Sequence, residues 1–148
     1  LNRLRPFNMS EPSTILGYAP IDHIHAEFET IVERATYCSD EDFPQRLDEV
    51  VQHLREHFAQ EDRWMQETDF PPGDCHRDEH ATVLRSADEV QALEGARRIE
   101  VGRNFVRELV AWFPGHADYL DSALAAWMCK REHGGKPVVL HRRLGGLA

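Results

Sequence analysis

Apolar side chains recur at steps of three and four residues along four stretches of this chain, which is the period of an amphipathic α-helix. In the first stretch the apolar stripe is formed by Ile21, Phe28, Val32 and Ala35. Comparable stripes run through residues 43–68, 75–93 and 105–131. No stretch shows the alternation of apolar and polar residues that is typical of a β-strand. The pattern therefore predicts four helices and no sheet.

Residues that start or stop helices separate these stretches. Pro44 fits the first turn of a helix, where its missing N–H is not needed. The run Phe-Pro-Pro-Gly-Asp at 70–74 divides the second stretch from the third. In the fourth stretch Pro114-Gly115 interrupts the stripe, and a proline inside a helix costs about 3 kcal/mol. We therefore expect a kink or a break at that point, with His116 opening the second segment.

Four amphipathic helices joined by short loops predict an all-α fold, an up-down-up-down antiparallel four-helix bundle. With 148 residues, the chain has the length of one domain with its own core. We assign residues 15–132 to the bundle and residues 1–14 to an N-terminal extension. Residues 133–148 contain four glycines and a proline and are expected to form a flexible C-terminal tail.

The composition narrows the classes of function. There are 26 acidic residues against 17 Lys and Arg, with a formal net charge of −9, which argues against binding to nucleic acid or to anionic membranes. The three cysteines lack the C-x-x-C spacing of a thiolate metal site, so free thiols in a reducing compartment are expected. No run approaches the roughly 20 apolar residues that span a bilayer. These features predict a cytoplasmic protein with no membrane insertion.

Seven side chains of metal-ligand type fall on the apolar faces of the predicted helices. Burying one unpaired polar group costs a few kcal/mol, and an unpaired carboxylate costs far more. A pair of metal ions would remove this conflict, whereas the alternative requires five separately hydrogen-bonded core histidines. The seven residues are His25, His57, Glu61, His76, His80, His116 and Asp121.

The spacing of these residues fits metal ligands on helices. His57 and Glu61, like His76 and His80, are four residues apart, which on an α-helix is about 40° of rotation and about 6 Å of rise. Asp121 is five residues beyond His116, about 140° around an α-helix, which suggests a carboxylate that reaches over to a second metal. Imidazole and carboxylate without thiolate suit iron, with zinc, copper and manganese as alternatives.

The order of these residues closely resembles the hemerythrin family, especially its bacterial single-domain members. The resemblance covers residues 15 to 131 and fills all seven ligand positions. It rests on D-x-x-H (Asp22, His25), H-F-x-x-E (His57, Phe58, Glu61), aromatic-Pro-x4-H-x-x-x-H (Phe70, Pro71, His76, His80) and W-x-x-x-H-x4-D (Trp112, His116, Asp121).

The resemblance implies two non-haem iron ions, with an oxo or hydroxo bridge between them, that bind dioxygen reversibly. By position, three histidines would hold one iron and His25 and His57 the other, while Glu61 and Asp121 would bridge. The iron with fewer histidines would keep the open site for dioxygen. The three histidines of the first iron are His76, His80 and His116.

The resemblance also indicates a dioxygen pocket. Phe58 and Trp112 match aromatic residues that line it in the family, and Phe28 and Phe113 are their expected neighbours. The alternative is that all four are ordinary core aromatics. An apolar lining matters because it controls the access of solvent to a metal site.

Several polar residues are weaker candidates. Asp118 departs from the family pattern and is either a partner of a metal ligand or a solvated charge; we favour the solvated charge. His23 points about 200° away from His25 and is expected on the surface. His53 is near the ligands in sequence, and Cys75 is expected to be an unreactive thiol at a helix start.

Three classes of function remain open at this point. The leading one is storage, transport or delivery of dioxygen. The second is an oxygen or redox sensor, for which the basic residues of the tail (Lys136, Arg142 and Arg143) offer a docking element. The third is a di-iron enzyme such as an oxidase or peroxidase. Carboxylate-rich di-iron proteins use Glu-x-x-His pairs. The histidine-rich set here favours reversible binding, so we expect a protein that is not an enzyme, with weak oxidase or peroxidase activity as the alternative.

Overall fold

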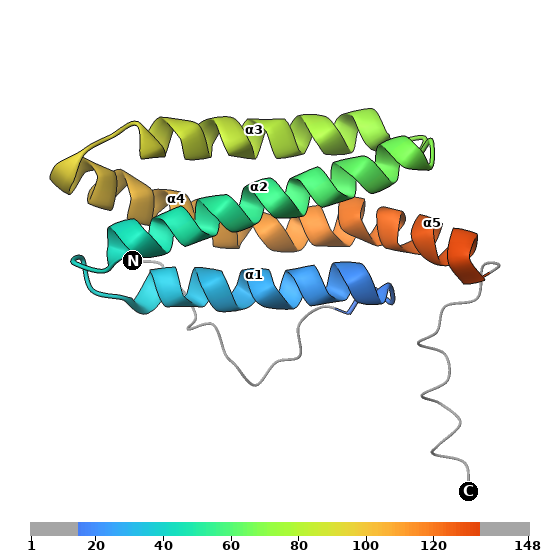
Figure 1. The fold of residues 1–148 in the computed structure, drawn as a ribbon, viewed down its shortest axis with the longest axis horizontal. Helices are drawn as coiled ribbons and strands as arrows, with labels where there is room; N and C mark the ends of the chain where they lie inside the picture. The colour runs from blue at the N-terminus through green and yellow to red at the C-terminus, as the bar shows by residue number, and fades with distance from the viewer. Residues whose placement is uncertain (1–14, 134–148) are drawn as a thin grey trace, which may run out of the picture.

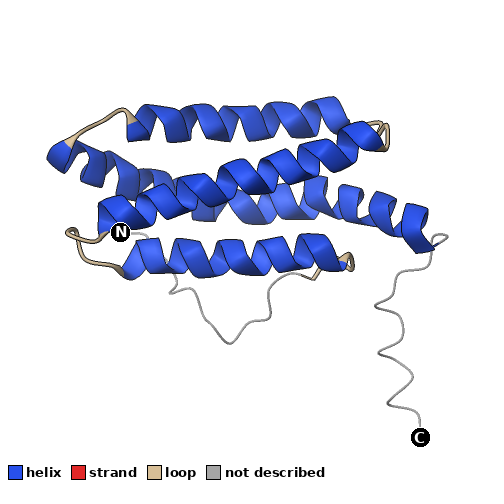
Figure 2. Ribbon diagram, viewed as in Figure 1, coloured by secondary structure: helices blue, strands red, loops and turns tan. Residues whose placement is uncertain are grey.

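The computed structural model describes residues 15–133, which form an antiparallel bundle of helices running alternately up and down (Figure 1). The predicted all-α fold is confirmed, and within the described residues helices are joined only by loops and turns (Figure 2). The predicted extension 1–14 and residues 134–148 of the predicted tail lie outside the described residues. The helices are α1 (Ala19–Tyr37), α2 (Phe43–Glu67), α3 (Gly73–Gln91), α4 (Gly95–His116), the π-helical turn η1 (Ala117–Asp121) and α5 (Ser122–His133).

The helix ends follow from residues that cannot continue a helix or that begin one easily. Pro20 and Pro44 both lie in first turns, where a proline loses no hydrogen bond. Helix α3 begins at Gly73, two residues before the predicted start, because the backbone N–H of His76 bonds to the carbonyl of Pro72 at 3.5 Å. Gly95 opens α4 with a φ of +59°, a left-handed conformation that favours glycine.

The predicted interruption at Pro114 is wrong in position. Helix α4 continues through Pro114 to His116, and the departure from α-helical geometry comes after it, at Ala117–Asp121. Pro114 is exposed, and on the solvent side of a helix the carbonyl left without its N–H partner can be hydrated instead. The chain therefore keeps one helical path from Gly95 to His133 and widens only at η1.

The core consists of two apolar layers with a polar layer between them. Along α1, Ile21 belongs to one apolar cluster and Phe28 to the other, and the buried His25 lies between them. Along α2, Phe58 and Met65 bracket Glu61 in the same way. The polar layer is thus bounded on both sides along the bundle axis by packed apolar side chains.

Side chains of α2 pack directly against the backbone of α4 at Gly102. A Cβ atom added to Gly102 would lie 2.7 Å from the ring of Phe43, which is closer than packed atoms approach, so only glycine fits there. Arg103 then lies over the same ring at 4.6 Å, a favourable cation–π distance. Gly102 and Arg103 therefore pack α4 against the first residue of α2.

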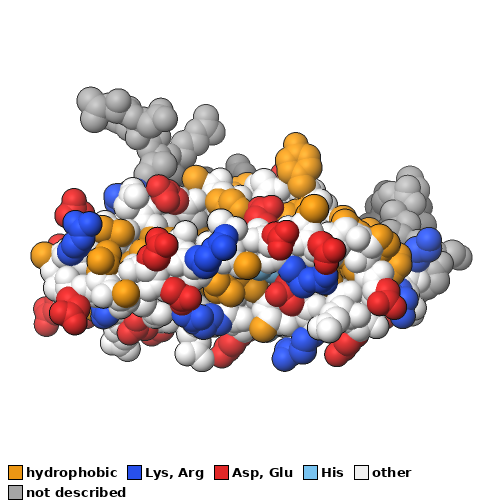
Figure 3. Space-filling model, turned by 90° about the horizontal axis from the view of Figure 1, so that it is seen from above, with side chains coloured by type: hydrophobic (Ala, Val, Ile, Leu, Met, Phe, Trp, Pro, Cys, Tyr) orange, Lys and Arg blue, Asp and Glu red, His pale blue; other side chains and the backbone are white. Residues whose placement is uncertain are grey.

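On the face seen in Figure 3, acidic and basic side chains are interspersed with apolar ones and do not separate into large patches. Among the helices of the described part, none is both long and apolar enough to cross a bilayer.

Candidate metal centre

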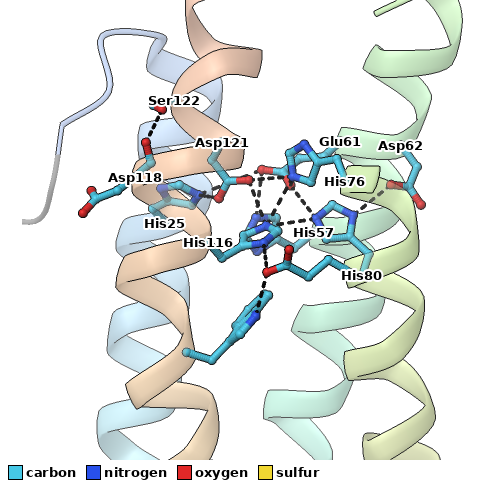
Figure 4. Close-up of polar contacts among 12 residues, drawn as sticks. His25, His57, Glu61, Asp62, His76, His80, His116, Asp118, Asp121 and Ser122 are labelled. Carbon is cyan, nitrogen blue, oxygen red and sulfur yellow. Dashed lines mark hydrogen bonds and ion pairs between the residues drawn. The ribbon is translucent and has the colours of Figure 1, made fainter. Parts of the chain in front are cut away.

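The seven side chains predicted as ligands converge in the middle of the bundle (Figure 4). Every one of them is at most 3% exposed. Helix α1 supplies His25, α2 supplies His57 and Glu61, and α3 supplies His76 and His80, while His116 ends α4 and Asp121 ends η1. All four arms of the bundle therefore contribute to one buried cluster.

The cluster divides into two groups, each of which could hold a metal ion. In one group, which we call the three-histidine group, three imidazoles meet both carboxylates: His76, His80, His116, Glu61 and Asp121. In the other, the two-histidine group, His25 and His57 meet the same two carboxylates. Ligand atoms within each group lie within 4.8 Å of one another. The two groups share Glu61 and Asp121, as the predicted bridging role requires.

Each shared carboxylate turns one oxygen to each group. For Asp121, Oδ1 lies 2.8 Å from Nε2 of His76, and Oδ2 lies 2.9 Å from Nε2 of His25. For Glu61, Oε1 lies 3.1 Å from Nε2 of His57, and Oε2 lies 3.2 Å from Nε2 of His80. A carboxylate placed in this way can bind two cations at once.

The π-helical turn explains how Asp121 reaches His116. An α-helix would have left the two residues about 140° apart, but in η1 the N–H of Ser122 bonds to the carbonyl of Ala117, five residues back. The wider turn places the residue five positions on nearly above the first, and Oδ1 of Asp121 lies 3.0 Å from Nε2 of His116. The separation of about 140° that α-helical geometry predicts for these two residues therefore does not apply here. Single π turns of this kind are often found at functional sites.

Two carboxylates that the sequence did not single out contact histidines of the three-histidine group through Nδ1, on the side of the ring away from the cluster. Nδ1–H of His80 donates to Asp62 at 2.8 Å, and Nδ1–H of His116 donates to Glu79 at 3.1 Å. Glu79 also accepts a hydrogen bond from the indole of Trp112 at 2.8 Å. Asp62 directly follows Glu61 and Glu79 directly precedes His80, so both lie at the edge of a buried face. Adjacency to a ligand was the one signal that could have revealed them.

The charges of the cluster are strongly coupled. Burial and the Asp121 carboxylate raise the pKa of Glu61, but His57 and His80 outweigh them and lower it to about 2. The pKa of Asp121 is also lowered, because contacts with His116, His25 and His76 overcome the effect of burial. For His80, burial lowers the pKa, but Asp62 and Glu61 raise it to about 9. Both carboxylates are therefore anionic near neutral pH and attract positive charge into the core.

The geometry fits metal ions better than hydrogen bonds alone. Nε2 of His25 and Oδ2 of Asp121 are close, yet within the described residues neither has a partner in hydrogen-bond geometry, and the same holds for Oε2 of Glu61. Nε2 of His116 lies 3.3 Å from that of His76 and 3.2 Å from that of His80. Lone pairs that converge in this way, from nitrogen and oxygen only, suit iron, zinc, copper or manganese.

The four predicted pocket aromatics all lie against the imidazoles, but on different sides. Phe58 stacks on His80 at 4.0 Å between ring centres, and Trp112 lies 4.3 Å from His116. The ring of Phe113 lies 4.9 Å from that of His25. The fourth, Phe28, lies 4.5 Å from Phe113 and 6.4 Å from His57. Phe28 and Phe113 thus border the two-histidine group.

The weaker candidates lie outside the two groups. Asp118 is exposed, as expected for a solvated charge, and the His23 side chain is 75% exposed beside Glu27. Cys75 is exposed at the start of α3. His53 differs from the others because it is only 8% exposed and lies 5.6 Å from His57, ring to ring. Burial and the neighbouring His57 lower its pKa to about 4, so His53 is a neutral residue of the core.

A helical bundle with two buried cation-binding groups that share two carboxylates defines a class of metal-binding protein. The family model described as the hemerythrin HHE cation binding domain matches residues 16–128. The chain is also 39% identical over 116 residues to a bacteriohemerythrin of Ralstonia nicotianae, an alignment that covers 78% of this chain and 85% of that protein. No solved structure matched the chain. The chain belongs to the hemerythrin family.

Proposed function

We propose that this protein binds dioxygen reversibly at a non-haem di-iron centre held by the seven buried ligands, and so stores, transports or delivers it. The observation that carries the proposal is the pair of shared carboxylates, each with one oxygen toward each group. Such sharing would let Glu61 and Asp121 hold two ions side by side. When bound, two irons supply the two electrons that dioxygen takes up on binding and returns on release.

The unequal number of histidines indicates which of the two groups can accept an added ligand. The three-histidine group offers five ligand side chains and the two-histidine group four, so the second has more room for an added ligand. Phe28, which is 3% exposed, and Phe113, which is half-buried, border that group. We therefore place dioxygen beside His25 and His57, against these two rings.

The surrounding residues support reversible binding over turnover. The two apolar clusters close the site along the bundle, which limits the water and protons that would drive irreversible oxidation of the iron. The donors are mainly imidazoles, in contrast to the Glu-x-x-His pairs of carboxylate-rich di-iron proteins. These features favour a protein that binds dioxygen without turnover. An oxidase or peroxidase is the alternative, and it would consume dioxygen or hydrogen peroxide catalytically.

The test is the optical spectrum of the reduced, iron-loaded protein during repeated exchange between nitrogen and air. We expect a visible charge-transfer band that forms in air, disappears on deoxygenation and returns over several cycles. Iron analysis of the same sample should give two ions per chain, one for each group. Catalytic consumption of dioxygen or hydrogen peroxide with added reductant, and no reversible band, would show an enzyme instead.

The variant Phe113→Ala tests the position of the pocket. Removing this ring should admit water beside His25 and speed irreversible oxidation several-fold, while the iron content stays unchanged. Tyr119→Ala is the matched control, because Tyr119 is an aromatic residue of the same helical arm that is 81% exposed. Equal oxidation rates for Phe113→Ala and Tyr119→Ala would show that dioxygen does not bind beside Phe113.

A further inference from the structure

The carboxylates that support the ligand histidines are distributed unequally between the two halves of the site. In the three-histidine group, His80 is held by Asp62 and His116 by Glu79, both through Nδ1. In the two-histidine group, both carboxylate contacts of His25 are made by Nε2. Nδ1 of His57 has no hydrogen-bond partner among the described residues, and the same is true of His76, so two of the three histidines in the first group are supported and His57 in the second is not. Carboxylates that bond to Nδ1 of a histidine are therefore found in the three-histidine group and not at His57.

This support has two chemical consequences for an imidazole. A hydrogen bond at Nδ1 keeps the proton on that atom, so that Nε2 presents its lone pair to the metal. The negative charge of the acceptor also makes the ring a stronger electron donor, which stabilises the more oxidised state of the metal. A bare imidazole such as that of His57 has neither effect.

Glu79 connects a third group to this arrangement. The same oxygen, Oε1, accepts the Nδ1–H of His116 and the indole N–H of Trp112, and the indole lies 4.3 Å from the imidazole. Both donors are therefore oriented by one carboxylate. The side chains of Asp62 and Glu79 are 36% and 38% exposed, so solvent screens part of their charge and their effect on the metal is moderate.

We propose that Asp62 and Glu79 are positioning residues that make the three-histidine side the more electron-donating half of the site. The inference rests on the proposed di-iron function but concerns residues outside the ligand set. It gives the asymmetry of the site an electronic cause in addition to the unequal number of histidines.

The test compares reduction potentials in isosteric variants. In Asp62→Asn and Glu79→Gln an oxygen acceptor remains but its charge is lost, so the folded bundle and the iron content should be retained. We expect the potential of the iron-loaded protein to rise in each variant, and to rise further in the double variant. Oxidation in air should then be slower than in the wild type. A merely structural loss would instead loosen the site and speed oxidation.

Asp78→Asn is the matched control for the loss of one surface charge, because Asp78 is the exposed neighbour of Glu79 on α3. Its potential should equal that of the wild type. The proposal is overturned if Asp62→Asn and Glu79→Gln have the same reduction potential as Asp78→Asn. It is also overturned if they oxidise faster than the wild type.

A second measurement does not depend on dioxygen or iron redox chemistry. In the zinc-loaded, diamagnetic protein labelled with ¹⁵N-histidine, Nδ1–H signals of His80 and His116 should appear far downfield and exchange slowly. Asp62→Ala should abolish the first and Glu79→Ala the second. Downfield signals with no reversible dioxygen band would leave the positioning role intact and refute the proposed function alone, whereas their absence in the wild type would refute the positioning role.

Discussion

Asp121 is the residue on which both halves of the site depend. One oxygen contacts His76 and His116 at 2.8 and 3.0 Å, and the other contacts His25 at 2.9 Å. It is fully buried, and its pKa is lowered because the surrounding imidazoles outweigh burial. The negative charge of Asp121 can therefore be neutralised only by the two groups that this carboxylate joins.

Replacing Asp121 should therefore damage both metal positions, whereas replacing His25 should damage one. We expect Asp121→Ala to lose most of its bound iron and its binuclear charge-transfer spectrum. His25→Ala should keep iron in the three-histidine group and lose it from the other. The matched control is Asp118→Ala, since Asp118 is an exposed carboxylate of the same turn. Iron counts and optical spectra measure all three, and a normal binuclear spectrum in Asp121→Ala would disprove the bridging assignment.

At this scale the sequence predicted which seven residues cluster in the core, and it did not predict the carboxylates that support them. The seven predicted ligands lie together because each falls on an apolar helical face, a pattern that can be read without coordinates. Asp62 and Glu79 were missed because half-exposed acidic residues are common on helices. A supporting carboxylate differs from an ordinary surface one only in the imidazole that it contacts. Helical periodicity does not predict such tertiary contacts.

The π-helical turn is the element that aligns Asp121, the last of the seven predicted ligands. A π turn closes its hydrogen bond over one more residue than an α turn, so η1 absorbs an extra residue and α5 keeps its packing. Leu124, Ala125 and Met128 of α5 remain in the apolar cluster with Ile21 and Met65. The sequence predicted an irregularity in this region but placed it at Pro114, because proline is a visible signal and a π turn has no comparable one.

This view of the turn makes a prediction about deletions. Removing Tyr119, which is 81% exposed, would leave His116 and Asp121 four residues apart, the spacing that faces one side of an α-helix. The turn should then close as a regular helix, and the protein should retain iron and a melting temperature near that of the wild type. Removing the exposed Ala111 from α4 should instead rotate His116 by about 100° relative to the preceding helix.

Iron content and thermal unfolding of the two deletion proteins compare these outcomes. The Ala111 deletion is the control for the loss of one exposed residue, and it should lose iron and stability together. If the Tyr119 deletion loses as much iron as the Ala111 deletion, then the extra residue is required by the site itself and not merely accommodated.

In the whole molecule, the polar layer joins all the helices at the place where an apolar core would otherwise be continuous. Burying two carboxylates and five imidazoles is costly unless they are paired, so bound metal should contribute to folding as well as to function. Removal of iron with a chelator should lower the melting temperature. A metal-free protein as stable as the iron-loaded one would show that the layer is satisfied by its own hydrogen bonds.

The gain in stability from the metal should also depend on pH, with a sign that follows from the pKa shifts. In the metal-free protein the pKa of His80 is raised from 6.5 to about 9 by Asp62 and Glu61 despite burial. Its contribution, at most about 3 kcal/mol, is therefore complete below pH 6.5 and lost as the pH rises through 9. The lowered pKa of Glu61, about 2 against 4.5, adds stability that is complete above pH 4.5 and lost on further acidification.

The lowered pKa of the buried His53, about 4 against 6.5, removes stability as the pH falls below 6.5, so metal-free protein should be most stable near pH 6.5. Metal binding has the opposite dependence, because the ion competes with the proton for Nε2 of His80. The difference in melting temperature between the iron-loaded and metal-free protein should therefore widen as the pH rises from 6.5 to 9. His80→Gln should flatten this trend and the exposed His23→Gln should preserve it, as thermal unfolding at a series of pH values would show. A difference that narrows toward pH 9 in the wild type would mean that His80 does not exchange its proton for the metal.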